Sequence, residues 1–139
     1  MSATVTWKKG MSFSGTGHTS NFTLPLGADE KVGGRNDGFR PTELILVGLA
    51  GCTAMDVISI LLKKRQEVSA FEVRADGDRA ENEPRRFTRF TLEYVVTGRG
   101  IDPAAVERAV ELSETKYCSV MATLRCAGPI ERKITIVEG

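Results

Sequence analysis

The chain has 139 residues, the size of one domain that can bury a hydrophobic core of its own. Its 19 basic and 18 acidic residues leave a formal net charge of +1, which argues against electrostatic attraction to nucleic acid or to acidic membranes. The chain has three cysteines and one histidine, with no Cys-x-x-Cys pair and no Cys/His cluster, so a structural zinc site is not expected. We therefore predict a single domain over residues 1–139, without a metal or a cofactor.

The first residues are polar where a secretory leader would need an apolar core, so we expect a cytoplasmic protein with reduced thiols. Val5 and Trp7 alternate with threonines, and residues 11–17 and 21–26 are typical of two further strands. Residues 27–40 are rich in glycine and charge and have no periodicity, which indicates a loop. Loops of this kind deliver polar groups to a rigid scaffold, so ligand contacts are expected there.

A long apolar helix is predicted over residues 41–65. Pro41 suits the first helical position, Glu43 lies in the first turn, and a basic triplet (63–65) lies in the last turn, where cations are favoured. Residues 44–62 are long enough to cross a membrane, but a carboxylate such as Asp56 costs roughly 2.5–3.5 kcal/mol near the centre of such a span. We therefore predict a core helix and no membrane. It is apolar on nearly every face, so a second copy of the chain is expected to cover part of it.

The second half alternates in the pattern of half-buried strands over 71–76 and 89–96. Asp102 and Pro103 then start a helix that runs to about residue 115, because an acceptor at the N-cap is followed by proline at the first helical position. A short helix follows over 119–126, and Ile134 and Ile136 indicate a last strand. This order predicts an α+β domain with antiparallel sheet covered by helices.

The cysteines are the candidate reactive groups. Cys118 precedes the short helix and has Lys116 nearby, and both features lower a thiol pKa, so helix geometry favours Cys118 as the thiolate. Cys52 lies about three turns inside the long helix, beyond the reach of its dipole, and would need a cation, for which Arg35 and Arg40 are nearest in sequence.

Other polar or reactive residues have plainer interpretations. Cys126 is expected to be a buried small hydrophobe, as free cysteines usually are. His18 is expected at the surface or in a turn rather than as a catalytic base. Asp56, one turn after Cys52, could be the partner of an arginine or could face a polar seam.

Two segments together resemble the OsmC/Ohr family, which takes its name from osmotically inducible protein C and organic hydroperoxide resistance protein. They are PTELILVGLAGCTAMDV, which contains Cys52, and KYCSVMATL, which contains Cys118. The resemblance spans nearly the whole chain and is strongest to the branch typified by YhfA. It implies an OsmC-like fold: antiparallel sheets packed on a long central helix, in an intertwined homodimer with active sites at the subunit interface.

The resemblance also implies roles for the cysteines. Cys52 would attack a hydroperoxide as the thiolate, and Cys118 would resolve the sulfenic acid into a disulfide that a cellular dithiol then reduces. In the family's peroxidases a glutamate directly after the helix-opening proline pairs with an activating arginine from the N-terminal strands. Here Thr42 holds that place, Glu43 comes one residue later, and no arginine precedes Arg35.

Two functions therefore remain open from the sequence. The first is a thiol-dependent peroxidase for organic hydroperoxides, in which Arg35 or Arg40 replaces the displaced arginine and Glu43 or Asp56 holds its guanidinium group. The second is a non-catalytic dimer of the same fold that binds a small apolar or thiol-containing ligand and has little peroxidase activity. A low thiol pKa at Cys52 would favour the first.

Overall fold

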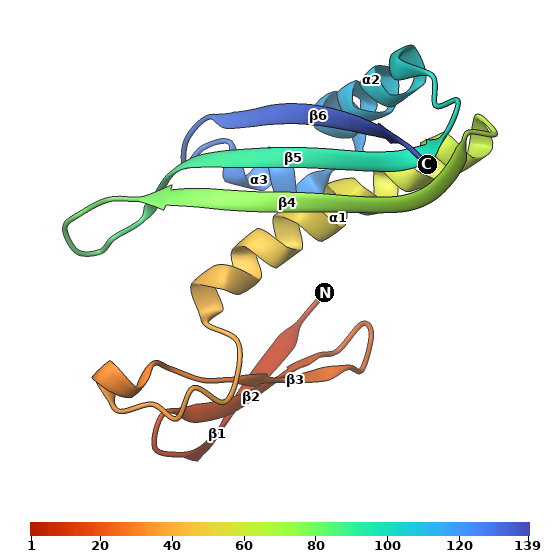
Figure 1. Ribbon diagram of the computed structural model, residues 1–139. Coiled ribbons are helices and arrows are strands. Elements are labelled where there is room, and N and C mark those ends of the chain that lie inside the picture. Colours follow the sequence, from red (N-terminus) through yellow and green to blue (C-terminus); the bar gives the residue numbers. More distant parts are fainter. The chain divides into compact units, whose positions relative to one another are not determined.

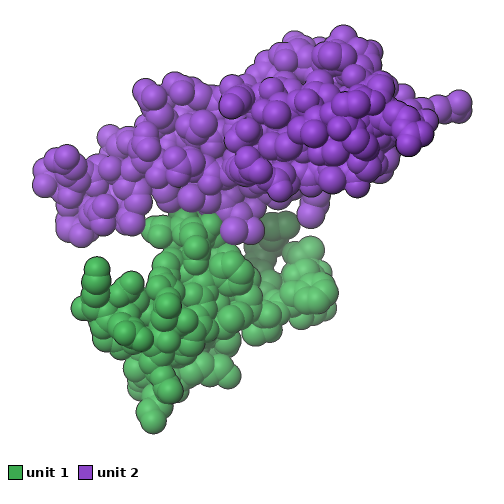
Figure 2. Space-filling view, in the orientation of Figure 1, with its two compact units in different colours: residues 1–45 green, residues 46–139 purple.

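The computed structural model describes residues 1–139 and divides into two compact units, residues 1–45 and 46–139 (Figures 1 and 2). The division falls inside the long helix α1 (Pro41–Lys63), so the first five residues of this helix belong to the first unit. Each unit is described separately below.

The first unit is the predicted three-stranded meander. Strands β1 (Ala3–Lys9), β2 (Ser12–Gly17) and β3 (Thr23–Leu26) pair antiparallel in chain order. Gly10 joins the first two strands with a φ of 56°, in the left-handed region that glycine adopts without strain. The predicted loop follows, interrupted only by the single 3-10 turn η1 (Glu30–Val32).

This loop packs closely on the sheet at one point. A Cβ on Gly38 would lie 2.7 Å from the backbone carbonyl carbons of Pro25 and Leu26, a separation that Cβ atoms in real proteins essentially never show. Phe39 also forms an isolated bridge with Leu26, and its N–H donates to the Pro25 carbonyl. The loop is therefore held along β3 up to the start of α1.

Helix α1 starts at Pro41 as predicted. The Glu43 carboxylate accepts a hydrogen bond of 2.8 Å from the Arg40 N–H, which satisfies one of the donors that the first turn leaves free. The helix ends at Lys63, and Arg65 follows with a φ of 56°, the left-handed conformation common just after helix ends.

Only one face of α1 is buried within the chain. Leu49, Thr53, Val57 and Leu61 recur every four residues and are fully buried. On the opposite side we define the open face of α1 by five residues: Val47, Met55 and Leu62, which are more than half exposed, and Gly48 and Gly51, where an added Cβ would meet no atom. The enclosure expected for this helix is therefore incomplete within one chain.

By length and composition alone, α1 could cross a membrane, although one such helix is weak evidence. Two observations favour a core helix instead. Its buried face contributes Leu49, Val57 and Leu61 to the hydrophobic core of the second unit, and Asp56 on the same helix accepts a hydrogen bond from the buried Ser113.

The sheet of the second unit has the order β4-β5-β6. Strands β4 (Glu67–Arg79) and β5 (Phe87–Arg99) form an antiparallel hairpin, whereas β6 (Ile130–Glu138) runs parallel to β5 with Ile134 opposite Tyr94. The sheet is therefore mixed, in contrast to the purely antiparallel one expected from the sequence. The reason is the helical connection between β5 and β6, because a crossover of this length returns the chain in the same direction.

That connection consists of α2 (Pro103–Leu112), the π-helical turn η2 (Ser113–Tyr117) and α3 (Ser119–Leu124). Together with α1, these helices cover one face of the sheet (Figure 1). Asp102 caps α2 by accepting from the Ala104 N–H at 3.0 Å, as the sequence predicts. The predicted alternation in β5 and the predicted inner face of α2 are both confirmed by full burial: Phe90, Leu92, Tyr94, Val96, Val106, Ala109, Val110 and Ser113.

Candidate functional site

Cys52 and Cys118 lie side by side in the second unit. Cys52 lies about three turns into α1 and is half-buried, while Cys118 is 3% exposed and forms the N-cap of α3. The Cys118 sulfur accepts a hydrogen bond from the Met121 N–H at 3.4 Å. Its thiol is close enough to the Cys52 sulfur to lower the pKa of Cys52. The π-helical turn η2 ends just before Cys118, and the backbone of Cys118 is extended.

The surroundings of Cys52 favour its thiolate. Partial burial raises the pKa of the Cys52 thiol. This pKa is lowered by three neighbouring donors, which are the Val120 N–H, the Cys118 thiol and the Ser119 hydroxyl. Together they outweigh burial, so the pKa of Cys52 is lowered. The Ser119 oxygen lies 4.0 Å from the Cys52 sulfur. The negative charge of Asp56 has a smaller, opposing effect. Cys52 is therefore the more acidic of the two thiols.

The surroundings of Cys118 have the opposite effect. Burial is the largest effect and raises the pKa of the Cys118 thiol. The Met121 N–H lowers this pKa, but the neighbouring Cys52 and Asp56 raise it further, and the pKa of Cys118 reaches about 11. The preference for Cys118 as the thiolate, drawn from helix geometry, is thus wrong. The start of α3 presents its Val120 N–H to Cys52 instead, while Cys118 is shielded from water.

A chain of buried hydroxyl groups leads from the sheet to Asp56. The Tyr94 hydroxyl lies 2.8 Å from Thr53 Oγ1, which lies 2.7 Å from Ser113 Oγ, and Ser113 donates to Asp56 Oδ2 at 2.9 Å. Because a carboxylate only accepts, the donors run in order from Tyr94 to Asp56. Burial raises the pKa of Tyr94 to about 12, so this donor keeps its proton. Of the two interpretations of Asp56, this geometry corresponds to the polar seam.

Sequence reasoning missed this network and the two donors near Cys52, Ser119 and the Val120 N–H. A signal was present for Thr53, Tyr94 and Ser113, since each is a hydroxyl residue at a position where the periodicity predicts burial. Buried hydroxyl groups are nearly always hydrogen-bonded, so three of them predict partners. Which residues those partners are depends on contacts between distant segments, which periodicity does not reveal.

The other predicted site residues belong to the first unit. Glu43 is engaged in the cap of α1 through one carboxylate oxygen. Arg40 donates to the Gly38 carbonyl and to Asn36 Oδ1, so its guanidinium is tied to its own loop. Arg35 is exposed and forms no ion pair. Contacts between these residues and the two cysteines remain predictions.

Two predictions for single residues have opposite outcomes. Cys126 is exposed in the turn after α3, so the expectation of a buried hydrophobe is wrong. The expectation rests on the apolar sequence around Cys126 and on a helix reaching residue 126, whereas α3 already ends at Leu124. His18 lies in the turn after β2, as expected, with its Nε2 2.6 Å from the Thr4 hydroxyl.

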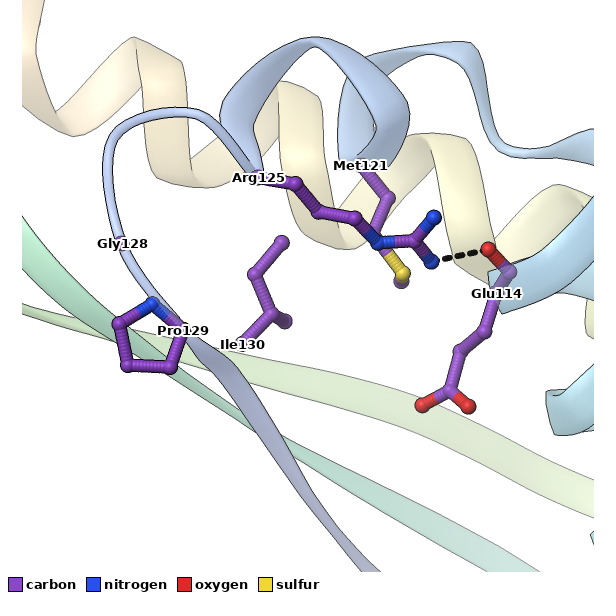
Figure 3. Close-up of a pocket in the computed structure, with 6 residues that line it drawn as sticks. All are labelled: Glu114, Met121, Arg125, Gly128, Pro129 and Ile130. Carbon is purple, nitrogen blue, oxygen red and sulfur yellow. Dashed lines mark hydrogen bonds between the residues drawn. The ribbon is translucent and has the colours of Figure 1, made fainter.

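Two cavities of about 340 Å³ each lie in the second unit. The one in Figure 3 is bounded by Met121, Glu114 and Arg125, but its charged groups are engaged: Arg125 donates to the Glu114 carbonyl oxygen, and the Glu114 carboxylate pairs with Arg132 at 3.2 Å. Burial also raises the pKa of Glu114. The other cavity is lined by Met55, Asp56, Ser59, Ile60, Lys63 and Tyr117, and its charged groups are not paired.

Comparison with known proteins gives consistent matches. Residues 34–133 match the family model for OsmC-like protein. The protein YhfA of Escherichia coli K12 is 40% identical over 140 residues, covering 99% of this chain and 98% of the relative. An OsmC-like protein from Mycoplasma pneumoniae superimposes with a TM-score of 0.81 at 18% identity, covering 98% of this chain and 96% of that one. An organic hydroperoxide resistance protein OsmC from Legionella pneumophila gives 0.70 at 13% identity, covering 96% and 94%.

Proposed function

Because the chain belongs to the OsmC-like protein family, we propose that it is a cytoplasmic, thiol-dependent peroxidase that reduces organic hydroperoxides. Membership of this family suggests a redox or peroxide-resistance role. The peroxidase assignment itself is carried by one observation, which is that the half-buried Cys52 of α1 lies beside the buried Cys118 at the N-cap of α3. The pKa shifts of the two thiols, which have opposite directions, support it. A lowered pKa provides the nucleophilic thiolate, and a raised pKa keeps the neighbouring thiol protonated until it is needed.

The proposed reaction has two steps in the protein. The Cys52 thiolate attacks the terminal oxygen of the hydroperoxide, the O–O bond breaks, and the leaving alkoxide takes a proton to become an alcohol. The resulting Cys52 sulfenic acid then condenses with the Cys118 thiol, which forms a disulfide and releases water. A cellular dithiol reduces this disulfide and returns both thiols.

The order of the steps agrees with the charges at the site. The anionic Cys52 is one of the groups that raise the pKa of Cys118. Once Cys52 has become a neutral sulfenic acid, that contribution is gone, and Cys118 gives up its proton more easily. Cys118 would thus become more reactive only after the first step has taken place.

We further propose that an arginine of the first unit binds near Cys52 and strengthens its thiolate. Arg35 is the better candidate because its guanidinium group is free, whereas Arg40 is bonded to Gly38 and Asn36. The carboxylate oxygen of Glu43 that the helix cap leaves free would hold the guanidinium group. Replacing Arg35 by methionine should then slow the reaction of Cys52 with hydroperoxide more than the same change at Arg40 does.

A homodimer is part of the proposal. The open face of α1 exposes valine, methionine and leucine side chains beside two glycines, a surface that a second helix could approach closely. The first unit also exposes Val5, Trp7 and Phe22. A partner subunit would cover apolar surface of this kind, as expected for an obligate interface.

Mass spectrometry of the oxidised protein tests the peroxidase assignment. In a C126S background, one equivalent of cumene hydroperoxide should yield a disulfide between Cys52 and Cys118. C118S should stop at a Cys52 sulfenic acid that dimedone traps, and C52S should not react. Oxidation confined to Cys118, or no oxidation in the wild-type chain, would contradict the assignment. The second result would favour the alternative of a ligand-binding dimer, for which the engagement of Glu43 in the helix cap is the supporting observation.

A further inference from the structure

The cavity lined by Asp56 and Lys63 starts one helical turn beyond Cys52. Cys52, Asp56, Ser59 and Lys63 follow the spacing i, i+4, i+7 and i+11 on α1, so they lie on one face of this helix. Asp56 is also close enough to Cys52 for its charge to oppose ionisation of the thiol. The reactive sulfur and the cavity therefore belong to one continuous strip of α1, between its buried face and its open face.

The two charged groups of this cavity are of opposite sign and are not paired. Asp56 is positioned by the Ser113 hydroxyl on Oδ2, and its other carboxylate oxygen has no hydrogen-bond partner. The Lys63 ammonium forms no ion pair. The Figure 3 cavity differs in this respect, because its carboxylate and its guanidinium are already bonded within the protein. An anchored carboxylate and a free ammonium in one cavity are complementary to a zwitterion.

The spacing along the helix suits an α-amino acid that contains sulfur. The Cα atoms of Asp56 and Lys63 are separated by about 10 Å along the axis, and the lysine Cβ points toward the helix N-terminus, so its long side chain can shorten the gap. Cys52 and Asp56 are separated by about 6 Å along the axis. A ligand whose ammonium group is bound at Asp56 would therefore have its sulfur about one helical turn away, on the side of Cys52. Ile60 and Tyr117 supply apolar walls, and Met55, which also belongs to the open face of α1, lines the cavity on the side next to that face.

We propose that this cavity binds disulfides of α-amino acids, such as cystine, and that Cys52 reduces them. The ammonium group lies on Asp56, the carboxylate lies on Lys63, and the disulfide faces the Cys52 sulfur. The proposal rests on the nucleophilic role proposed above for Cys52 and adds a second class of substrate to it.

The exchange balances without any further oxidant. The Cys52 thiolate attacks one sulfur of the ligand, the disulfide bond breaks, and one amino-acid thiolate leaves and takes a proton from water. Cys118 then loses its proton to water and attacks the Cys52 sulfur. This step forms the Cys52–Cys118 disulfide and expels the second amino-acid thiolate. One ligand disulfide is reduced, two protein thiols are oxidised, and the dithiol of the peroxidase cycle restores them.

The test compares four disulfides that differ in charge, reacting with the reduced C126S protein at pH 7. They are cystine, cystamine with ammonium groups only, 3,3′-dithiodipropionate with carboxylates only, and the neutral 2-hydroxyethyl disulfide. Cystine is expected to react at least about tenfold faster than the neutral disulfide, since its charged groups form charge-assisted hydrogen bonds that the neutral disulfide cannot form. Each rate is divided by the rate of the neutral disulfide in the same variant, which cancels any change in the Cys52 pKa.

The variants separate the two contacts. D56N should lower the relative rates of cystine and cystamine and leave that of dithiodipropionate unchanged or raised. K63M should lower those of cystine and dithiodipropionate. K64M, a matched change at a neighbouring lysine that does not line the cavity, should lower neither. Equal rates for all four disulfides, or equal effects of K63M and K64M, would overturn the proposal.

Cumene hydroperoxide, tested on the same proteins, distinguishes this proposal from the proposed peroxidase. If the hydroperoxide oxidises Cys52 while the disulfides react alike, the peroxidase stands and the cystine site is rejected. If cystine is preferred and the hydroperoxide does not react, the cystine site stands and the peroxidase is rejected.

Discussion

At the scale of single residues, the acidity of Cys52 depends on three consecutive positions at the start of α3. Cys118, Ser119 and Val120 each supply a hydrogen-bond donor to its sulfur. The backbone donor at Val120 cannot be removed by substitution, but the two side-chain donors can. In the proposed reaction Cys118 therefore has two functions, because it helps to activate Cys52 before it resolves the oxidised sulfur.

The first prediction concerns this activation. C118A should raise the pKa of Cys52, because it removes a donor to the thiolate, and the rate of Cys52 alkylation by iodoacetamide at pH 7 should fall several-fold. S119A should have a similar but smaller effect, since its donor is the lesser one. The measurement is the pH profile of alkylation at Cys52, followed by mass spectrometry, with C126A as the control that leaves the profile unchanged. A profile for C118A that moves to lower pH would contradict the account.

At the scale of elements, α1 has three distinct strips. One is buried in the core, one is the open face, and the strip between them contains Cys52, Asp56 and Lys63. The buried strip includes Thr53, whose hydroxyl links Tyr94 of β5 to Ser113 of η2. The network thus fixes α1 against the sheet and against the turn that positions Cys118.

The second prediction concerns that network. T53V keeps the side-chain shape but leaves the buried hydroxyls of Tyr94 and Ser113 with one partner fewer, which should lower the free energy of unfolding by about 1–3 kcal/mol. T123V on α3 is the matched control, because Thr123 also donates a hydrogen bond but is exposed. Its cost should stay within about 0.5 kcal/mol. Urea denaturation of both variants measures the difference, and equal costs would rule out a structural role for the network.

At the scale of the whole molecule, the open face of α1 is the feature that one chain leaves unexplained. Its large side chains are more than half exposed, although they continue the most apolar segment of the sequence. The homodimer proposed above accounts for this exposure, since a second subunit would bury the face.

The third prediction is that V47D dissociates the homodimer. An aspartate on the open face would be buried without a partner in the interface, which costs several kcal/mol, whereas A104D places the same charge on the exposed side of α2 and should change nothing. Light scattering at micromolar concentration should report a dimer for the wild-type chain and for A104D, and a monomer or aggregate for V47D. A folded wild-type monomer under these conditions would reject the dimer.

Much of the fold was predictable from sequence, because local chemistry decides it. Pro41 and Asp102 mark helix starts, and the alternation from Phe90 to Val96 defines the buried face of β5. The parallel pairing of β6 was not predictable from its own residues, since strand direction depends on the whole connection that precedes it.

The candidate site divides in the same way. The two motifs identify Cys52 and Cys118 as a pair, but the local rule for helix starts assigned the lower pKa to the wrong one. That rule considers only the helix on which a cysteine stands. The decisive effects are the burial of Cys118 and the donors that α3 presents to a different helix, and both arise from tertiary packing.

Single-turnover stopped-flow kinetics measures whether Cys52 is the acidic thiol that attacks a hydroperoxide. The reduced C126S protein is mixed with cumene hydroperoxide, or with hydrogen peroxide for comparison, across a range of pH. Because the thiolate is the nucleophile, the rate should rise with pH and level off with a midpoint below 9.0, the ordinary thiol value, and C118S should retain this first step. A midpoint of the pH profile near 11, the pKa of Cys118, would show that Cys52 is not the attacking thiol. A reaction rate that C52S leaves unchanged would show the same.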